Sequence, residues 1–133
     1  MNRLPKKRQR RAVLEKTVNQ PFGTVTIAPD VLSAIVSLTA QDVAGVARLG
    51  SVPGQQRVGS MLGSGTANAD GVAIRVVDDS VSADCYLIAQ PDVNLLDLGA
   101  RVQSAVTEAL NEMVGMPVSA VNVYIQDVEQ NRG

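Results

Sequence analysis

The 133-residue chain contains no histidine and a single cysteine, Cys85. Zinc sites built from cysteine and histidine are therefore excluded, and so are nucleophiles activated by a histidine base. One cysteine cannot form a disulfide within the chain, which fits a reducing cytoplasm. These absences predict a non-enzymatic protein with no metal site, no cofactor and no catalytic residue.

Aromatic residues make up only 2% of the chain, as Phe22, Tyr86 and Tyr124, and there is no tryptophan. Because apolar residues still make up 45%, the core must be built from Val, Leu, Ile and Ala. Such a core lacks the aromatic faces on which single-stranded nucleic acid stacks. No apolar run approaches the roughly 18 residues that span a bilayer, and the charged N-terminus is not followed by the apolar segment of a secretory signal.

Charge is distributed unevenly along the chain. Residues 1–16 hold seven basic residues and one carboxylate, a net charge of +6, whereas the remainder holds five basic and twelve acidic residues, a net charge of −7. The run KKRQRR repels itself, so residues 1–20 are expected to form a flexible basic arm. The arm could bind anionic lipid, nucleic acid or an acidic partner protein, or it could only help to keep the chain in solution. The candidate binding residues are Lys6, Lys7, Arg8, Arg10 and Arg11.

The remaining pattern predicts one α+β domain over residues 21–129, followed by a short tail at 130–133. Residues 24–28 alternate as a strand, and residues 72–76 and 81–89 alternate as a hairpin with its turn at Asp78-Asp79. A helix is expected to open at Asn94, with Asp97 completing its cap, and to stop at Gly115 before a last strand at 121–126. Gly99 within this helix is interpreted as room for a close backbone contact. Two helices and a mostly antiparallel sheet make a two-layer sandwich.

The first expected helix, residues 29–42, is apolar nearly all round. Its only polar stripe consists of Asp30, Ser33, Ser37 and Gln41, whereas a surface helix normally has a broad polar face. We therefore expect this helix to be either sandwiched within the domain or partly covered by another molecule. The candidate assembly surface is Val31, Ile35 and Leu38.

Three other features could suggest a phosphate, calcium or thiol site, but each has a simpler structural interpretation. GSMLGSGT, residues 59–66, lacks the lysine of a phosphate-binding loop and belongs to a Gly-rich loop expected over residues 50–71. Asp78 and Asp79 with Asp84 lack the spacing of a calcium loop and fit a turn beside a solvated strand. Cys85 shares an alternating face with Val81 and Leu87, which predicts a buried thiol.

Two long segments of the chain resemble the bacterial alkaline shock protein family, also described as envelope stress response proteins. They are residues 23–50 and residues 72–128, and the most specific elements are IAPDVL, VAGVARLG and MVGMPVSAVNVYIQDV. The resemblance implies a non-enzymatic, cytoplasmic, self-associating protein that is linked to envelope stress and held near the inner face of the membrane by an anchoring partner protein. The basic arm and residues 50–71 fall outside the family pattern.

The functional hypothesis is therefore a stress-associated structural or interaction protein that forms a homo-oligomer and acts near the cell envelope. The alternative is an accessory nucleic-acid-binding protein that uses its basic N-terminal arm. The acidic body disfavours extended contact with nucleic acid, because it would repel the phosphate backbone that the arm attracts.

Overall fold

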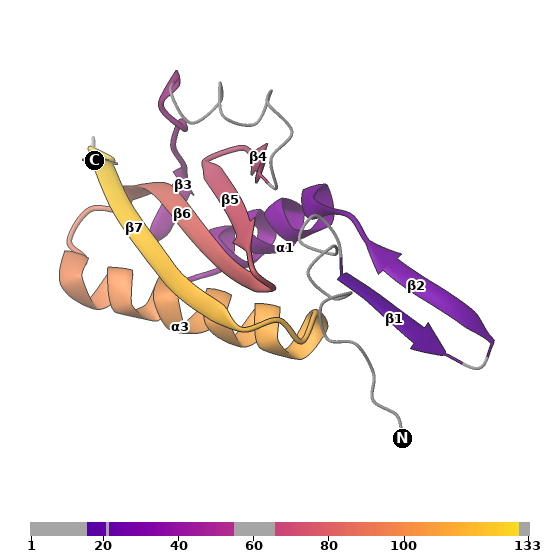
Figure 1. Ribbon diagram of the computed structural model, residues 1–133. Helices are drawn as coiled ribbons and strands as arrows, with labels where there is room; N and C mark the ends of the chain where they lie inside the picture. The colour runs from indigo at the N-terminus through magenta and orange to yellow at the C-terminus, as the bar shows by residue number, and fades with distance from the viewer. Residues whose placement is uncertain (1–15, 21, 55–65, 131–133) are drawn as a thin grey trace.

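The computed structural model describes residues 16–20, 22–54 and 66–130. The chain forms a five-stranded sheet with two helices on one face, together with a separate two-stranded hairpin (Figure 1). In chain order the elements are β1 Lys16–Gln20, β2 Gly23–Ile27, α1 Pro29–Gln41, β3 Val46–Leu49, β4 Thr66–Ala69, β5 Val72–Val77, β6 Ser80–Ala89, α3 Leu95–Met113 and β7 Val118–Val128. The expected two-layer α+β sandwich is confirmed.

Strand β6 is the centre of the sheet. On one side it pairs antiparallel with β5 through its first half and with β3 through its last residues, and on the other side it pairs parallel with β7. The junction lies at Tyr86, whose N–H donates to Gly71 O at 2.8 Å and whose carbonyl accepts from Gly50 N at 2.6 Å. Gly71 has φ +67°, and a Cβ there would lie 2.6 Å from Leu49 Cβ, so only glycine fits this junction.

The β5–β6 hairpin follows the sequence closely. Asp78 and Asp79 have φ of 51° and 66°, the left-handed pair that a two-residue hairpin turn requires. The register runs from Val77↔Ser80 to Val72↔Cys85. One face of both strands is consequently apolar and covered by the helices, and the other is the outer face of the sheet.

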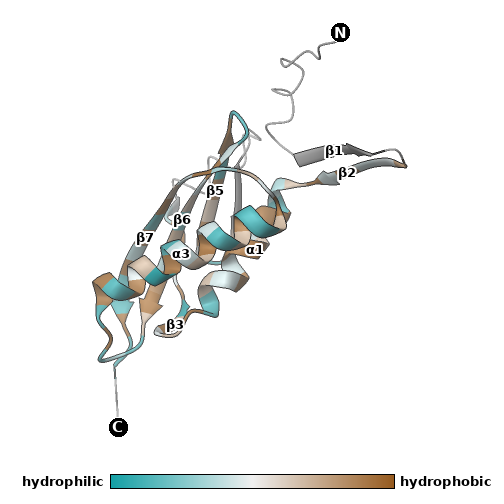
Figure 2. Cartoon of the chain, turned by 90° about the horizontal axis from the view of Figure 1, so that it is seen from below, coloured by the Kyte–Doolittle hydropathy of each residue, from teal (hydrophilic) through white to brown (hydrophobic). Residues whose placement is uncertain are grey.

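The helices α1 and α3 lie side by side beneath the sheet (Figure 2). The core between the layers is aliphatic, as the composition requires, and its fully enclosed large side chains include Val36, Ile74, Leu87, Leu98, Val102, Val106 and Leu110. Pro29 occupies the first turn of α1, where its missing N–H leaves no hydrogen bond unmade. Gly115, with φ +75°, follows the end of α3 as expected.

Three expectations need correction. Lys16–Gln20, assigned to the flexible arm, is strand β1, and Thr66–Ala69, assigned to the 50–71 loop, is strand β4. Each is a short strand that is hydrogen-bonded to its neighbour, β2 or β5, and neither contains an alternating series of large apolar residues. Gly99 makes no close backbone contact, because a Cβ built there meets nothing within 4 Å.

Candidate functional site

Only two of the three residues of the candidate assembly surface on α1 have exposed side chains. Val31 is 45% exposed and Leu38 is 68% exposed, whereas Ile35 is half-buried and packs against the core. Ala34 is exposed between Val31 and Leu38 on the same helical stripe. The outward apolar stripe of α1 is therefore Val31, Ala34 and Leu38, and we keep the name α1 stripe for these three residues.

The polar stripe of α1 is divided, with Asp30 and Gln41 exposed at its ends and the two serines between them facing inward. Ser33 and Ser37 are 2% and 8% exposed and point into the molecule. Ser33 Oγ donates to Asp30 O at 3.0 Å, so the buried hydroxyl has a partner within its own helix. Because small serines can pack inward in this way, apolar residues are left on the outside of the helix.

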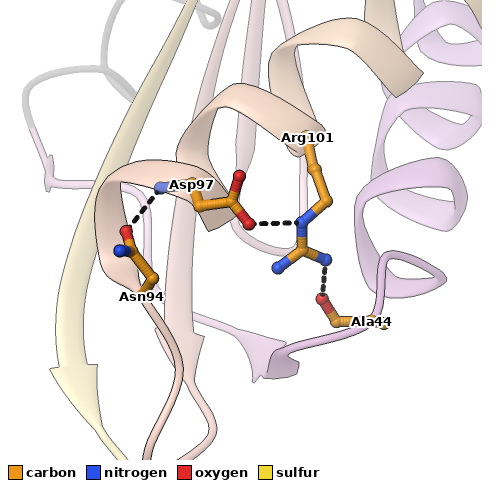
Figure 3. Close-up of polar contacts among 4 residues, drawn as sticks. All are labelled: Ala44, Asn94, Asp97 and Arg101. Carbon is orange, nitrogen blue, oxygen red and sulfur yellow. Dashed lines mark hydrogen bonds and ion pairs between the residues drawn. The ribbon is translucent and has the colours of Figure 1, made fainter.

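Contacts at the start of α3 fix α1 relative to α3 (Figure 3). Asn94 Oδ1 accepts from the Asp97 N–H at 2.9 Å, which is the expected cap. Arg101 Nε donates to Asp97 Oδ2 at 3.2 Å, and Arg101 Nη1 donates to Ala44 O at 2.6 Å, just beyond the end of α1. A single guanidinium thus joins the first turn of α3 to the loop that follows α1.

The outer edge of β7 is a second candidate contact. Val121 O accepts from Gln103 Nε2 at 3.0 Å, so the backbone groups of residue 121 point away from β6. Because backbone groups alternate along a strand, those of Val123 and Ile125 point the same way. No described strand pairs with this side of β7, and residues 118–126 carry no charged side chain. Natural proteins usually protect such an edge with charge, proline or a covering element.

The outer face of the sheet contains a small polar cluster and an aromatic pair. Asp84 is 4% exposed; its Oδ1 accepts from Asn122 Nδ2 at 2.9 Å, and its Oδ2 lies 3.7 Å from Arg75 Nη1. Next to it, the rings of Tyr86 and Tyr124 stack with centroids 4.8 Å apart. The carboxylate is thus held by neighbouring strands, which is a structural arrangement rather than an open ligand site.

Residues with reactive side chains are not brought together in the described part of the chain. Cys85 is fully enclosed, and burial, followed by the nearby Asp84 charge, raises the pKa of its thiol to about 12. Among the described residues, no group of three or more His, Cys, Asp or Glu side chains could hold a metal ion. Asp84 points to Asn122 and Arg75 on the outer face, while Asp78 and Asp79 form the hairpin turn.

An open depression of about 500 Å³ lies on α3, lined by Gln103, Ser104, Thr107, Glu108, Asn111 and Glu112. All of these residues come from one helix, so within the described residues it is a hollow on a polar helix face rather than a cleft between elements. Nothing in it pairs a nucleophile with a base.

The strand expected at residues 24–28 is confirmed as β2, but β1 and its pairing with β2 in a hairpin were not predicted. The hairpin forms a sheet of its own and extends away from the sandwich beyond the start of α1 (Figure 1). Phe22 at its turn is 99% exposed, and Gly23 has φ +133°. The signal in the sequence was the uncharged stretch from Thr17 to Ala28, which breaks sharply from the basic run before it.

Two further sequence features lie outside the described residues. The five arm residues Lys6, Lys7, Arg8, Arg10 and Arg11 precede residue 16, and all but the last residue of GSMLGSGT falls between 54 and 66. No helix in the described part of the chain is long and apolar enough to cross a membrane.

Comparison with known families confirms the resemblance. Residues 17–130 match the model of the alkaline shock protein 23 family, described by a cell envelope-related function. The match spans every element from the hairpin to β7 except the first residue of β1.

Three curated relatives illustrate the similarity. The uncharacterized protein YqhY of Bacillus subtilis is 28% identical over 109 residues, which cover 81% of this chain and 78% of YqhY. The uncharacterized protein Spy1614 of Streptococcus pyogenes serotype M6 is 24% identical over 112 residues, 84% of this chain and 93% of that protein. The uncharacterized protein YloU of Bacillus subtilis is 25% identical over 108 residues, 80% and 89% of the two chains.

Among solved structures, a manganese form of a MamM CTD variant aligns with a TM-score of 0.45 and 14% identity. The alignment covers 74% of this chain and 84% of the MamM chain.

Proposed function

This chain belongs to the alkaline shock protein 23 family, whose function is cell envelope-related, and we propose that it is a non-enzymatic, stress-associated interaction protein that self-associates near the envelope. The observation that carries the proposal is the family match over residues 17–130. In this proposal the protein is cytoplasmic and reaches the inner face of the membrane through a partner protein.

The side-chain inventory supports the absence of catalysis. The chain has no histidine, and its one thiol is enclosed in the core with a raised pKa, so the thiolate that would act as a nucleophile is not formed at neutral pH. Turnover of a small molecule that is lost on changing one polar residue would contradict this part of the proposal.

Two surfaces support self-association. The α1 stripe places Val31 and Leu38 in water although both are apolar, and covering them with a second copy would remove that apolar area from solvent. The outer edge of β7 offers the unpaired backbone groups of Val123 and Ile125, which can be satisfied by another strand. The first surface contributes apolar area, and the second contributes directional hydrogen bonds.

Sedimentation of the purified full-length chain over a wide concentration range tests the proposal. Leu38→Glu places a charge on the α1 stripe and is expected to weaken self-association by roughly tenfold or more, the effect of about 1.4 kcal/mol. Leu96→Glu is the matched control, because Leu96 is also an exposed leucine, 89% exposed, and belongs to the other helix, α3.

A wild-type chain that stays monomeric at the highest concentration would contradict self-association. Equal weakening by Leu38→Glu and Leu96→Glu would leave self-association in place but would refute the α1 stripe as its contact.

A further inference from the structure

The β1–β2 hairpin has apolar side chains that are exposed to solvent. All residues from Phe22 to Thr26 are exposed, including Val25 and the phenylalanine at the turn. Among the described strands these two pair with each other alone, in register from Lys16↔Ile27 to Gln20↔Gly23. Isolated two-stranded hairpins are only marginally stable in water, so this one gains from contact with another surface.

The charge pattern indicates the chemistry of that surface. Residues 17–28 carry no charged side chain, whereas residues 1–16, joined directly to β1, carry a net charge of +6. The rest of the molecule carries a net charge of −7. The uncharged tip of the hairpin, close in sequence to this positive charge, complements a surface that has negative groups outside and an apolar layer beneath them. The acidic remainder of the chain would then face the solvent.

We propose that the β1–β2 hairpin docks on an anionic lipid bilayer, with Phe22 inserted at the interface. Aromatic side chains favour the boundary between headgroups and acyl chains, and each basic residue near an anionic membrane adds attraction. Insertion is limited to the tip, because the outer edges of the two strands carry backbone groups that hydrocarbon cannot satisfy.

A lipid surface is favoured over nucleic acid by two observations. The tip offers a single aromatic ring, whereas binding of single strands relies on several stacked bases along a basic groove. The net charge of the body opposes a phosphate polymer that would extend across it. This inference extends the proposed envelope-proximal function by giving the chain a direct contact with lipid in addition to any partner.

The absence of tryptophan from the chain makes a site-specific test available. Phe22→Trp introduces one fluorophore at a position that is 99% exposed, so the substitution leaves the core untouched. The matched control is Leu96→Trp, at a position that is 89% exposed on α3. Each full-length variant is titrated with vesicles of phosphatidylglycerol and phosphatidylcholine, with phosphatidylcholine vesicles alone, and with single-stranded RNA.

We expect a blue shift in the emission of the Phe22→Trp variant, and quenching of that emission by bromine-labelled acyl chains, with the anionic vesicles only. The emission of the Leu96→Trp control should not change. Phe22→Ala should weaken vesicle partitioning by roughly tenfold or more, because a buried phenylalanine contributes that much to transfer from water. High salt should weaken binding of the wild-type chain as the arm is screened.

An unchanged spectrum of the Phe22→Trp variant with anionic vesicles overturns the inference, and so does an equal response of both fluorophores. A response to RNA without a response to vesicles overturns it in favour of nucleic acid. Sedimentation of the same variants without lipid separates this result from the proposed function: intact self-association without vesicle binding refutes the lipid contact alone.

Discussion

At the scale of single residues, Cys85 shows how burial controls both reactivity and stability. It lies on the core face of β6 between Asp84 and Tyr86, with no side-chain exposure. Loss of water around the thiolate raises its pKa from the ordinary 9.0 to about 12, and the negative charge of Asp84 adds to the effect. The thiol is therefore a small apolar side chain at neutral pH.

The raised pKa predicts that the chain loses stability at alkaline pH through Cys85. Below pH 9 the thiol is protonated in both the folded and unfolded states and contributes nothing. As pH rises from 9 toward 12, the unfolded chain ionises while the folded one does not, so the free energy of unfolding falls by up to about 1.4 kcal/mol per pH unit. Urea unfolding of wild type and Cys85→Ala, each below pH 9 and near pH 11, measures the difference.

The alanine variant should be less stable than wild type at the lower pH, because a cavity replaces the thiol. Its disadvantage should shrink by roughly 1 to 3 kcal/mol at the higher pH. A disadvantage that is independent of pH would show that the thiol ionises freely in the folded chain.

At the same scale, the sequence predicted some side chains and not others. Alternation along residues 81–89 placed Cys85 correctly, because a strand with one covered face leaves little choice. The pattern of α1 did not predict that Ser33 and Ser37 are buried. Ser33 can turn inward because its hydroxyl donates to the Asp30 carbonyl in the same helix. The exposed side chain between Val31 and Leu38 is therefore that of Ala34, and not that of Ile35 as expected.

At the scale of elements, the cap of α3 is the best-defined local contribution to stability. Asn94→Ala removes the acceptor of the Asp97 N–H and should lower the free energy of unfolding by about 0.5–2 kcal/mol. Asn94→Asp should retain most of that stability, because a carboxylate accepts the same hydrogen bond and favours the helix N-terminus. Chemical denaturation of the three chains measures the effect.

The matched control for the cap is Asn111→Ala, the same substitution at an exposed position within α3. It should be neutral or slightly stabilising, because alanine is the better helix former. A loss at residue 111 equal to that at residue 94 would attribute the effect to asparagine in general rather than to the cap.

The sequence predicted the turns and helix ends that depend on the chemistry of one or two neighbouring residues. The Asp78-Asp79 turn, the Asn94 cap and the stop at Gly115 all follow from residue chemistry. β4 was not predicted because the apolar residues of Thr66–Ala69 are two alanines, which strands disfavour, and the segment is positioned by pairing with β5. The parallel pairing of β7 with β6 also has no local signal, since it depends on how α3 crosses between the two strands.

At the scale of the whole molecule, the chain divides into a sandwich that contains the core and a hairpin that touches the core through Ile27 at its base. Among the residues whose burial is described, every buried one lies from Leu32 onward, and the side chains of Phe22 to Thr26 in the hairpin are exposed. The family match includes both parts. Because residues 22–26 are exposed, the proposed contact with a lipid surface would give this part of the hairpin a role outside the sandwich.

This division predicts the result of removing residues 1–25. The shortened chain keeps Thr26, Ile27 and the Ala28 carbonyl that accepts from Val31 N, so the start of α1 is preserved. Its free energy of unfolding should stay within about 0.5 kcal/mol of the full chain, as for surface changes away from the core. Urea denaturation measures this, and hydrogen exchange on the full chain should show the hairpin amides opening well before those of β6.

The same deletion separates the two proposed activities, because the α1 stripe and the edge of β7 remain while Phe22 and the basic arm are lost. Sedimentation should therefore show unchanged self-association, and anionic vesicles should no longer retain the protein. A drop of more than about 2 kcal/mol in stability would place the hairpin within the cooperative fold. Loss of self-association with stability intact would instead make the hairpin a contact between copies rather than with lipid.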